Sequence, residues 1–231
     1  MKTIILLHGA IGANDQLEPL TKELIQKGFQ VFSFNFSGHG QKPFQNNFGI
    51  EQFADELEQF IATQHLEKPN VFGYSMGGYV ALYLAHKQPT LLGNIITLGT
   101  KFEWTPEIAQ KETKMLDAKI ILEKVPKFAE DLKTRHGNEW ELLLSKTAEM
   151  MLSLGTNNAL SLNDYTAIEN KILIGLADKD TMVSLAETTA VYKQLKNGAM
   201  YMLPNTKHPI ETVNVSSLAK IINDLIKKKT H

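Results

Sequence analysis

Short runs of apolar and β-branched residues alternate along this chain with longer segments whose apolar residues recur at helical spacing. This alternation constrains the fold more than any other feature, because parallel strands need a crossover connection that is usually a helix. Strands are expected at 3–7, 30–35, 69–73, 94–98, 171–176 and 199–203. Helices are expected at 15–27, 50–65, 76–87, 184–196 and 212–228. The pattern predicts an α/β protein with a mostly parallel sheet flanked by helices.

The alternation stops between residues 101 and 168, where no strand-like run appears and Lys, Glu, Met and Leu recur at helical spacing. Residues 1–100 and 169–231 are therefore expected to form the core domain, and residues 101–168 a helical cap, or lid, inserted into it. The insertion has more apolar side chains than solvated helices need, so some should pack on the core and others should line a pocket. These residues are Trp104, Ile108, Met115, Leu116, Phe128, Trp140, Leu143, Leu144, Met150 and Met151.

Charge and cysteine content exclude several classes of function. The 24 basic and 25 acidic residues nearly cancel, so no overall field attracts nucleic acid or an anionic membrane surface. The absence of cysteine rules out disulfides, thiolate catalysis and cysteine metal sites, and is typical of a reducing compartment. No apolar run approaches the length of a membrane span. We therefore expect a cytoplasmic protein whose partner is a small molecule, with no nucleic acid and no membrane span.

One short motif carries chemistry: Gly73-Tyr74-Ser75-Met76-Gly77, between a predicted strand and a predicted helix. A serine hydroxyl is a poor nucleophile, and a sharp strand-turn-helix elbow presents it beside a base and beside free helical N–H groups. The two glycines lack Cβ atoms, which lets the arms of the elbow approach closely. The alternative interpretation is that Ser75 merely caps the following helix.

Position in the chain favours His208 as the base for Ser75 among the seven histidines. His208 lies in a loop directly after the last predicted strand, and an open parallel sheet binds its ligands at that edge. His65 and His86 lie within or at the ends of predicted helices, and His136 lies in the insertion. The sequence therefore predicts a Ser75–His208 pair.

Two aspartates, Asp178 and Asp180, follow the predicted strand 171–176 and are candidates for the acid that orients the histidine. Such an acid fixes the tautomer of the imidazole and stabilises the imidazolium that forms during catalysis. Each aspartate is equally well suited to an ordinary turn. The residues alone do not choose between the two aspartates. With either one, the candidate residues follow one another along the chain in the order serine, aspartate, histidine.

With this order the chain resembles the α/β-hydrolase-fold superfamily, in particular its esterase- and lipase-like serine hydrolases, over nearly its whole length. In these proteins a strand ending in His-Gly precedes the oxyanion loop, as His8 and Gly9 do here. The resemblance implies that the backbone N–H groups of Ala10 and Met76 form the oxyanion hole, with Ile11 as the neighbouring candidate.

The resemblance also selects one aspartate. The acid of the family is commonly followed three residues later by valine, as Asp180 is by Val183, so Asp180 is the predicted acid and Asp178 the alternative. The family ending His-Pro-hydrophobic-Glu matches residues 208–211 and supports His208 as the base.

Two further segments are compared with the family pattern. Residues 35–40 resemble its Asp-x-x-Gly-x-Gly turn with Asn35 in place of the acid, and His39 is expected to belong to that turn. Family members usually have one or two antiparallel strands before the His-Gly strand, whereas this chain starts with that strand. A sheet of about six strands with an exposed edge is therefore expected, which favours pairing into a homodimer.

The resemblance implies hydrolysis of a carboxylic ester, or less readily of a thioester, lactone or small amide, through an acyl-enzyme on Ser75, with no metal or organic cofactor. Methionine and aromatic residues of the insertion favour an apolar acyl or alcohol group. One alternative is C–C bond chemistry, as in menaquinone-pathway synthases or meta-cleavage-product hydrolases, although the former usually have Arg where Tyr79 stands. The other alternative is a non-catalytic ligand-binding protein of the same fold.

Overall fold

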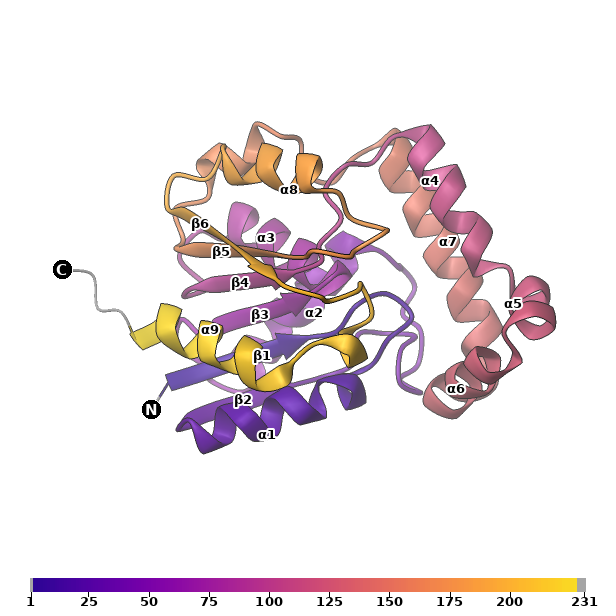
Figure 1. The fold of residues 1–231 in the computed structure, drawn as a ribbon, viewed down its shortest axis with the longest axis horizontal. Helices are drawn as coiled ribbons and strands as arrows, with labels where there is room; N and C mark the ends of the chain where they lie inside the picture. The colour runs from indigo at the N-terminus through magenta and orange to yellow at the C-terminus, as the bar shows by residue number, and fades with distance from the viewer. Residues whose placement is uncertain (1, 228–231) are drawn as a thin grey trace.

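The computed structural model describes residues 2–227 and contains a six-stranded sheet (Figure 1). Its strands are β1 (Lys2–Leu7), β2 (Phe29–Ser33), β3 (Asn70–Tyr74), β4 (Ile95–Leu98), β5 (Ile172–Ala177) and β6 (Gly198–Leu203). They lie in the order β2-β1-β3-β4-β5-β6, and every neighbouring pair is parallel. All six predicted strands are confirmed.

Helices cover both faces of the sheet (Figure 1). One face is covered by α1 (Glu18–Gln26) and α9 (Val215–Lys227). The other is covered by α2 (Ile50–Thr63), α3 (Met76–Lys87) and α8 (Leu185–Tyr192). These are the five predicted helices; residue 228, the last of the predicted segment 212–228, lies outside the described residues.

The inner strands are mainly apolar because both faces of the sheet are buried. In β1, Ile5 and Leu7 belong to the core beneath α2 and α3, whereas Ile4 and Leu6 belong to the core beneath α1 and α9. Side chains of a strand alternate between the two faces, so a doubly covered strand needs an apolar residue at every position. This explains why continuous runs rather than alternating ones marked the strands in the sequence.

The segment between β4 and β5 is helical, as predicted, and lies beyond the carboxyl ends of the strands (Figure 1). It contains α4 (Pro106–Thr113), α5 (Ala118–Lys124), α6 (Pro126–His136) and α7 (Trp140–Thr156). Helices α4 and α7 pack closely against each other, where Gly155 faces Ala109. The two ends of the segment meet at Phe102 and Tyr165, whose rings pack edge to face with centroids 5.9 Å apart.

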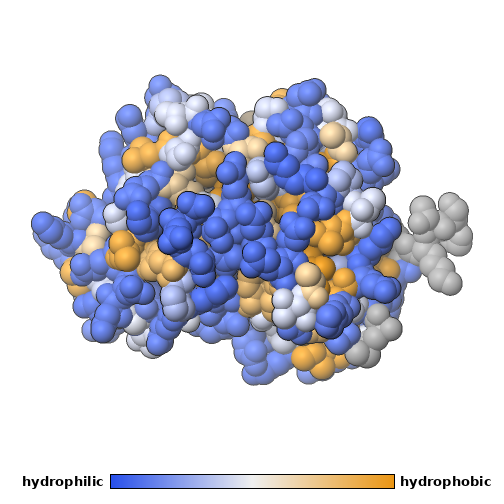
Figure 2. Space-filling view, turned by 180° about the vertical axis from the view of Figure 1, so that it is seen from behind, coloured by the Kyte–Doolittle hydropathy of each residue, from blue (hydrophilic) through white to orange (hydrophobic). Residues whose placement is uncertain are grey.

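The apolar residues of this segment have several different environments. Trp140 and Leu144 are buried in a small cluster of their own, whereas Met115 is 73% exposed. Figure 2 shows a mainly hydrophilic surface with apolar patches, among them one at the end formed by α5 and α6. In the described part of the chain, no helix combines the length and the apolar character needed to cross a membrane.

Strands β2 and β6 form the two edges of the sheet. The expected homodimer stays a prediction, and these edges are where a second copy would pair.

Candidate active site

Ser75 lies at the sharp turn between β3 and α3, with φ 50° and ψ −118°. A Cβ atom on Gly77 would lie 2.6 Å from the carbonyl oxygen of Leu7, and one on Gly73 would collide with the backbone of Gly77 and Gly78. Both glycines are therefore required for the close approach of β3, α3 and β1. Ser75 is the N-cap residue of α3, but its side chain makes no capping hydrogen bond to the helix.

His208 is bonded to Asp180 in the loops that follow β6 and β5. The Nδ1 atom of His208 lies 2.7 Å from Oδ2 of Asp180. The other carboxylate oxygen, Oδ1, accepts the N–H groups of Met182 and Val183, each at 2.9 Å. The hydroxyl of Tyr74 donates to the carbonyl oxygen of His208 at 2.9 Å and so fixes the histidine loop. These contacts hold an imidazole whose Nδ1 is engaged and whose Nε2 remains available.

Asp178 is exposed and makes no hydrogen bond to His208 among the described residues. Its carboxylate accepts the N–H of Thr206 at 2.8 Å, which ties the β5 and β6 loops together. Its role is that of a turn residue, whereas the side chain of Asp180 is only 1% exposed. The structure thus brings Asp180, not Asp178, to the histidine.

The carboxyl of Asp180 is held in its charged form. Burial raises its pKa, but the hydrogen bonds from His208 and from the N–H groups of Val183 and Met182 outweigh burial, and the net pKa lies below the usual value. A charged acceptor at Nδ1 selects the tautomer with the proton on Nδ1. Nε2 of His208 can then accept a proton.

Ala10 and Met76 line the same pocket as Ser75. Within residues 2–227, no acceptor is bonded to the backbone N–H of either residue. Ile11, next to Ala10, has φ 50°, a left-handed conformation unusual for a β-branched residue. The loop after β1 is therefore held in a specific strained shape beside Ser75.

His136, the last residue of α6, fixes this loop from the helical segment. Its Nε2 atom lies 2.9 Å from the carbonyl oxygen of Ile11, and its Nδ1 accepts the N–H of Gly40 at 3.0 Å. Burial lowers the pKa of His136, which keeps it neutral and able to accept and donate at once. No signal in the sequence distinguished His136, because its partners lie far away along the chain.

The two other buried histidines of this region are structural. The Nε2 atom of His8 accepts the N–H of Phe36 at 3.2 Å, and burial lowers the pKa of His8 to about 4. His39 is buried in the turn that follows β2, where its ring stacks on Phe48. His39 is not among the residues that line the pocket, and its placement in the turn is confirmed.

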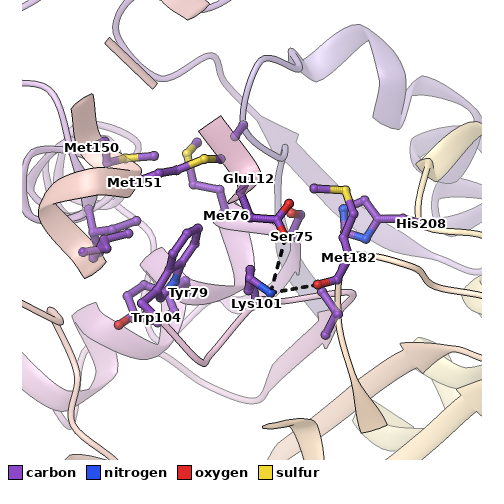
Figure 3. A pocket seen from close by; sticks show the side chains of 14 residues that line it. Ser75, Met76, Tyr79, Lys101, Trp104, Glu112, Met150, Met151, Met182 and His208 are labelled. Atoms are coloured by element: carbon purple, nitrogen blue, oxygen red, sulfur yellow. Dashed lines mark hydrogen bonds and ion pairs between the residues drawn. The ribbon is translucent and has the colours of Figure 1, made fainter. Parts of the chain in front are cut away.

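The pocket in front of Ser75 is narrow and mainly apolar (Figure 3). Trp104 and the α7 residues Met150 and Met151, expected from the sequence to include pocket residues, form much of its wall together with Tyr79. Its free volume is about 50 Å³, room for only a few water molecules. Flexible methionine side chains can move aside when a larger group enters.

Lys101 and Glu112 also line the pocket, and sequence reasoning missed both (Figure 3). Lys101 follows β4, and Glu112 is on α4. Both side chains are largely buried, and their charged groups lie 3.9 Å apart. In the described part of the chain, no three His, Asp or Glu side chains gather in a way that could hold a metal ion.

A family model described as the alpha/beta hydrolase fold matches residues 2–140 of this chain. The chain belongs to the α/β-hydrolase fold family. The matched region contains the elbow with Ser75 and the loop with Ala10.

Curated relatives include enzymes of several specificities. Proline iminopeptidase PfmaB of Pestalotiopsis fici is 24% identical over 98% of this chain and 89% of its own length. A pimeloyl-[acyl-carrier protein] methyl ester esterase of Neisseria meningitidis is 35% identical over 38% of this chain and 33% of its own length. The sn-1-specific diacylglycerol lipase ABHD11 of Danio rerio is 27% identical, but the match spans only 41% of this chain and 30% of that protein.

Solved structures share the fold of this chain at low identity. The enol-lactonase from Burkholderia xenovorans LB400 superposes with a TM-score of 0.80 at 16% identity and covers 98% of this chain and 92% of its own. A thermophilic esterase from Thermogutta terrifontis superposes with a TM-score of 0.78 at 17% identity, covering 98% and 90%. The relatives named above range from an iminopeptidase to esterases, so the shared fold does not specify a substrate.

Proposed function

We propose that this protein is a serine hydrolase that cleaves a carboxylic ester or related acyl bond of a small molecule through an acyl-enzyme on Ser75. The observation that carries the proposal is a strained serine elbow opening into the same pocket as a histidine bonded to a buried aspartate. Relatives named as esterase, lipase and lactonase support this class of reaction. A cytoplasmic location and a helical cap formed by residues 101–168 are parts of the proposal.

In the proposed mechanism, Nε2 of His208 takes the proton of the Ser75 hydroxyl as Oγ attacks the carbonyl carbon. The N–H groups of Ala10 and Met76 donate to the oxyanion of the tetrahedral intermediate. His208 then gives its proton to the leaving oxygen, and the acyl group stays on Ser75. Water, deprotonated by His208, releases the acid in a second round. Asp180 stabilises the imidazolium in both steps.

No described residue is hydrogen-bonded to the Ser75 hydroxyl. Such contacts are often long in structures without substrate and tighten when the pocket is filled.

The C–C bond alternative receives less support. Tyr79, at the position where menaquinone-pathway synthases usually have Arg, donates its hydroxyl to Asn158 and accepts the N–H of Leu160. A hydroxyl engaged on both sides is not free to bind an anionic substrate.

The test combines a fluorophosphonate probe with a panel of p-nitrophenyl esters of increasing acyl length. The probe should label the intact protein but not Ser75→Ala, and kcat/KM should fall by on the order of 10³-fold or more in the variant. A folded intact protein that stays unlabelled would show that Ser75 is not a nucleophile and would favour the ligand-binding alternative. Labelling without turnover of any ester would point instead to C–C bond chemistry.

A further inference from the structure

Glu112 is a carboxylate with little water and no hydrogen-bond donor. Its side chain is 10% exposed and lines the pocket in front of Ser75 (Figure 3). Among residues 2–227, none donates a hydrogen bond to its carboxylate. The nearest cation, Nζ of Lys101, lies 3.9 Å away, beyond hydrogen-bond distance. A carboxylate that lines a pocket and has no bonded donor can accept hydrogen bonds from a ligand that enters the pocket.

The Lys101 ammonium interacts with several groups other than Glu112. It donates to the carbonyl oxygen of Met182 at 2.8 Å. Its ammonium also lies 3.7 Å from the carboxylate of Glu187 and 5.9 Å from the centre of the Trp104 ring. Lys101 therefore has a hydrogen-bonded partner of its own, while Glu112 on α4 has only the 3.9 Å ion pair with Lys101 and no hydrogen bond.

Glu187, unlike Glu112, accepts hydrogen bonds from the protein. Its carboxylate accepts the N–H of Phe102 at 3.3 Å and the hydroxyl of Ser184 at 3.2 Å. The cluster thus contains two carboxylates and a single ammonium. Of the two carboxylates, Glu112, which lines the pocket, is the one that accepts no hydrogen bond from a described residue.

We propose that Glu112 binds a protonated amino group of the substrate, so that the preferred acyl compounds carry an alkylammonium group. The surrounding wall suits such a group, because Met150 and Met151 can pack on its alkyl chain. The inference rests on the proposed function, since it names the substrate class of the same site.

The kinetic test compares methyl esters with the same six-carbon acyl chain. These are methyl hexanoate, methyl 6-aminohexanoate, norleucine methyl ester and monomethyl adipate. The rate of hydrolysis of each ester is measured from the acid released at constant pH. At least one amino ester should have a kcat/KM about tenfold above that of methyl hexanoate. Glu112→Gln should reduce this ratio to about one, because the neutral amide attracts an ammonium far less.

The matched control is Glu107→Gln, which changes an exposed carboxylate on the same helix that does not line the pocket. It should keep the ratio of the intact protein. Preference for methyl hexanoate, or for monomethyl adipate through Lys101, would overturn the proposal.

A binding measurement separates this inference from the proposed function. Hexylammonium should raise the melting temperature of Ser75→Ala, whereas 1-hexanol and hexanoate should not, and the rise should vanish in Ser75→Ala/Glu112→Gln. If hexylammonium binds through Glu112 but no ester is hydrolysed, the amine site stands and the hydrolase proposal fails. If methyl hexanoate is hydrolysed through Ser75 without amine preference or amine binding, the amine site is refuted and the hydrolase proposal stands.

Discussion

Ser75 has a backbone conformation that a residue with a side chain disfavours, at a cost of about 1–3 kcal/mol. Such a conformation persists only where the surroundings impose it. Here the N–H of Ser75 donates to the carbonyl oxygen of Leu98 at 2.8 Å, and the hydroxyl of Thr100 donates to the carbonyl oxygen of Ser75 at 3.0 Å. The next strand in the sheet, β4, and the residues after it therefore hold the elbow in place.

The two aspartates after β5 provide a prediction at the same scale. Asp180→Asn should lower kcat by on the order of 10⁴-fold, because an amide at this position favours the wrong tautomer of His208. Asp178→Asn should change kcat by less than about threefold, since the Asp178 carboxylate bonds only the backbone of the neighbouring loop. Steady-state kinetics on one p-nitrophenyl ester, with circular dichroism to confirm folding, decides between them. A collapse of activity in Asp178→Asn alone would reverse the assignment.

At the scale of elements, the junction of β3 and α3 tolerates no added atom. In Gly73→Ala the new methyl group would collide with the backbone at the start of α3, which cannot yield without shifting the helix. We expect the free energy of unfolding to fall by about 1–3 kcal/mol, measured by urea denaturation, together with a loss of esterase activity.

Gly12→Ala is the control for this substitution. Its methyl group would meet chiefly the end of the flexible Gln16 side chain, which can swing away. Its effect on stability should be clearly smaller. Equal destabilisation by both substitutions would contradict the close approach described for the elbow.

The elements themselves could be predicted because local sequence determines them. The inner strands β3, β4 and β5 are mainly apolar runs buried on both faces. The hydroxyl of Ser184 accepts the N–H of Glu187 and so caps α8. Boundaries differ by one to a few residues; the predicted helix 15–27, for example, begins as a 3₁₀ turn at Asn14–Leu17.

The site was only partly predictable for a related reason. Ser75 directly follows β3, and Asp180 and His208 lie in the loops after β5 and β6, so parallel topology brings all three to one edge. Glu112 reaches the pocket, and His136 reaches the loop after β1, only through the way α4 and α6 lie over that edge. No pattern along the chain encodes such a crossing.

At the scale of the whole molecule, buried histidines make the fold sensitive to acid. Burial lowers the pKa of His8 from 6.5 to about 4, and burial lowers those of His39 and His136 too. Below about pH 6.5 these histidines bind protons in the unfolded chain but stay neutral in the folded chain. The free energy of unfolding therefore falls as the pH drops from about 6.5 toward 4, with a contribution of about 3 kcal/mol from His8 alone.

Urea denaturation between pH 7.5 and 4.5 measures this effect. His8→Gln should be less stable at pH 7.5 but should lose less stability on acidification than the intact protein. His65→Asn, at an exposed position, should keep the full loss. A stability that does not change over this range would show that His8 is not held neutral by burial.

The edge-to-face contact of Phe102 and Tyr165 closes the base of the inserted helices. Entry and exit therefore share one narrow joint between adjacent strands β4 and β5. Away from this joint, His136 of α6 is hydrogen-bonded to the backbone of Ile11 and Gly40 in the core. Transplanting helices 106–156 to another scaffold of this fold would therefore require matching two places, the joint at Phe102 and Tyr165 and the His136 contacts, before the wall of the pocket could be exchanged.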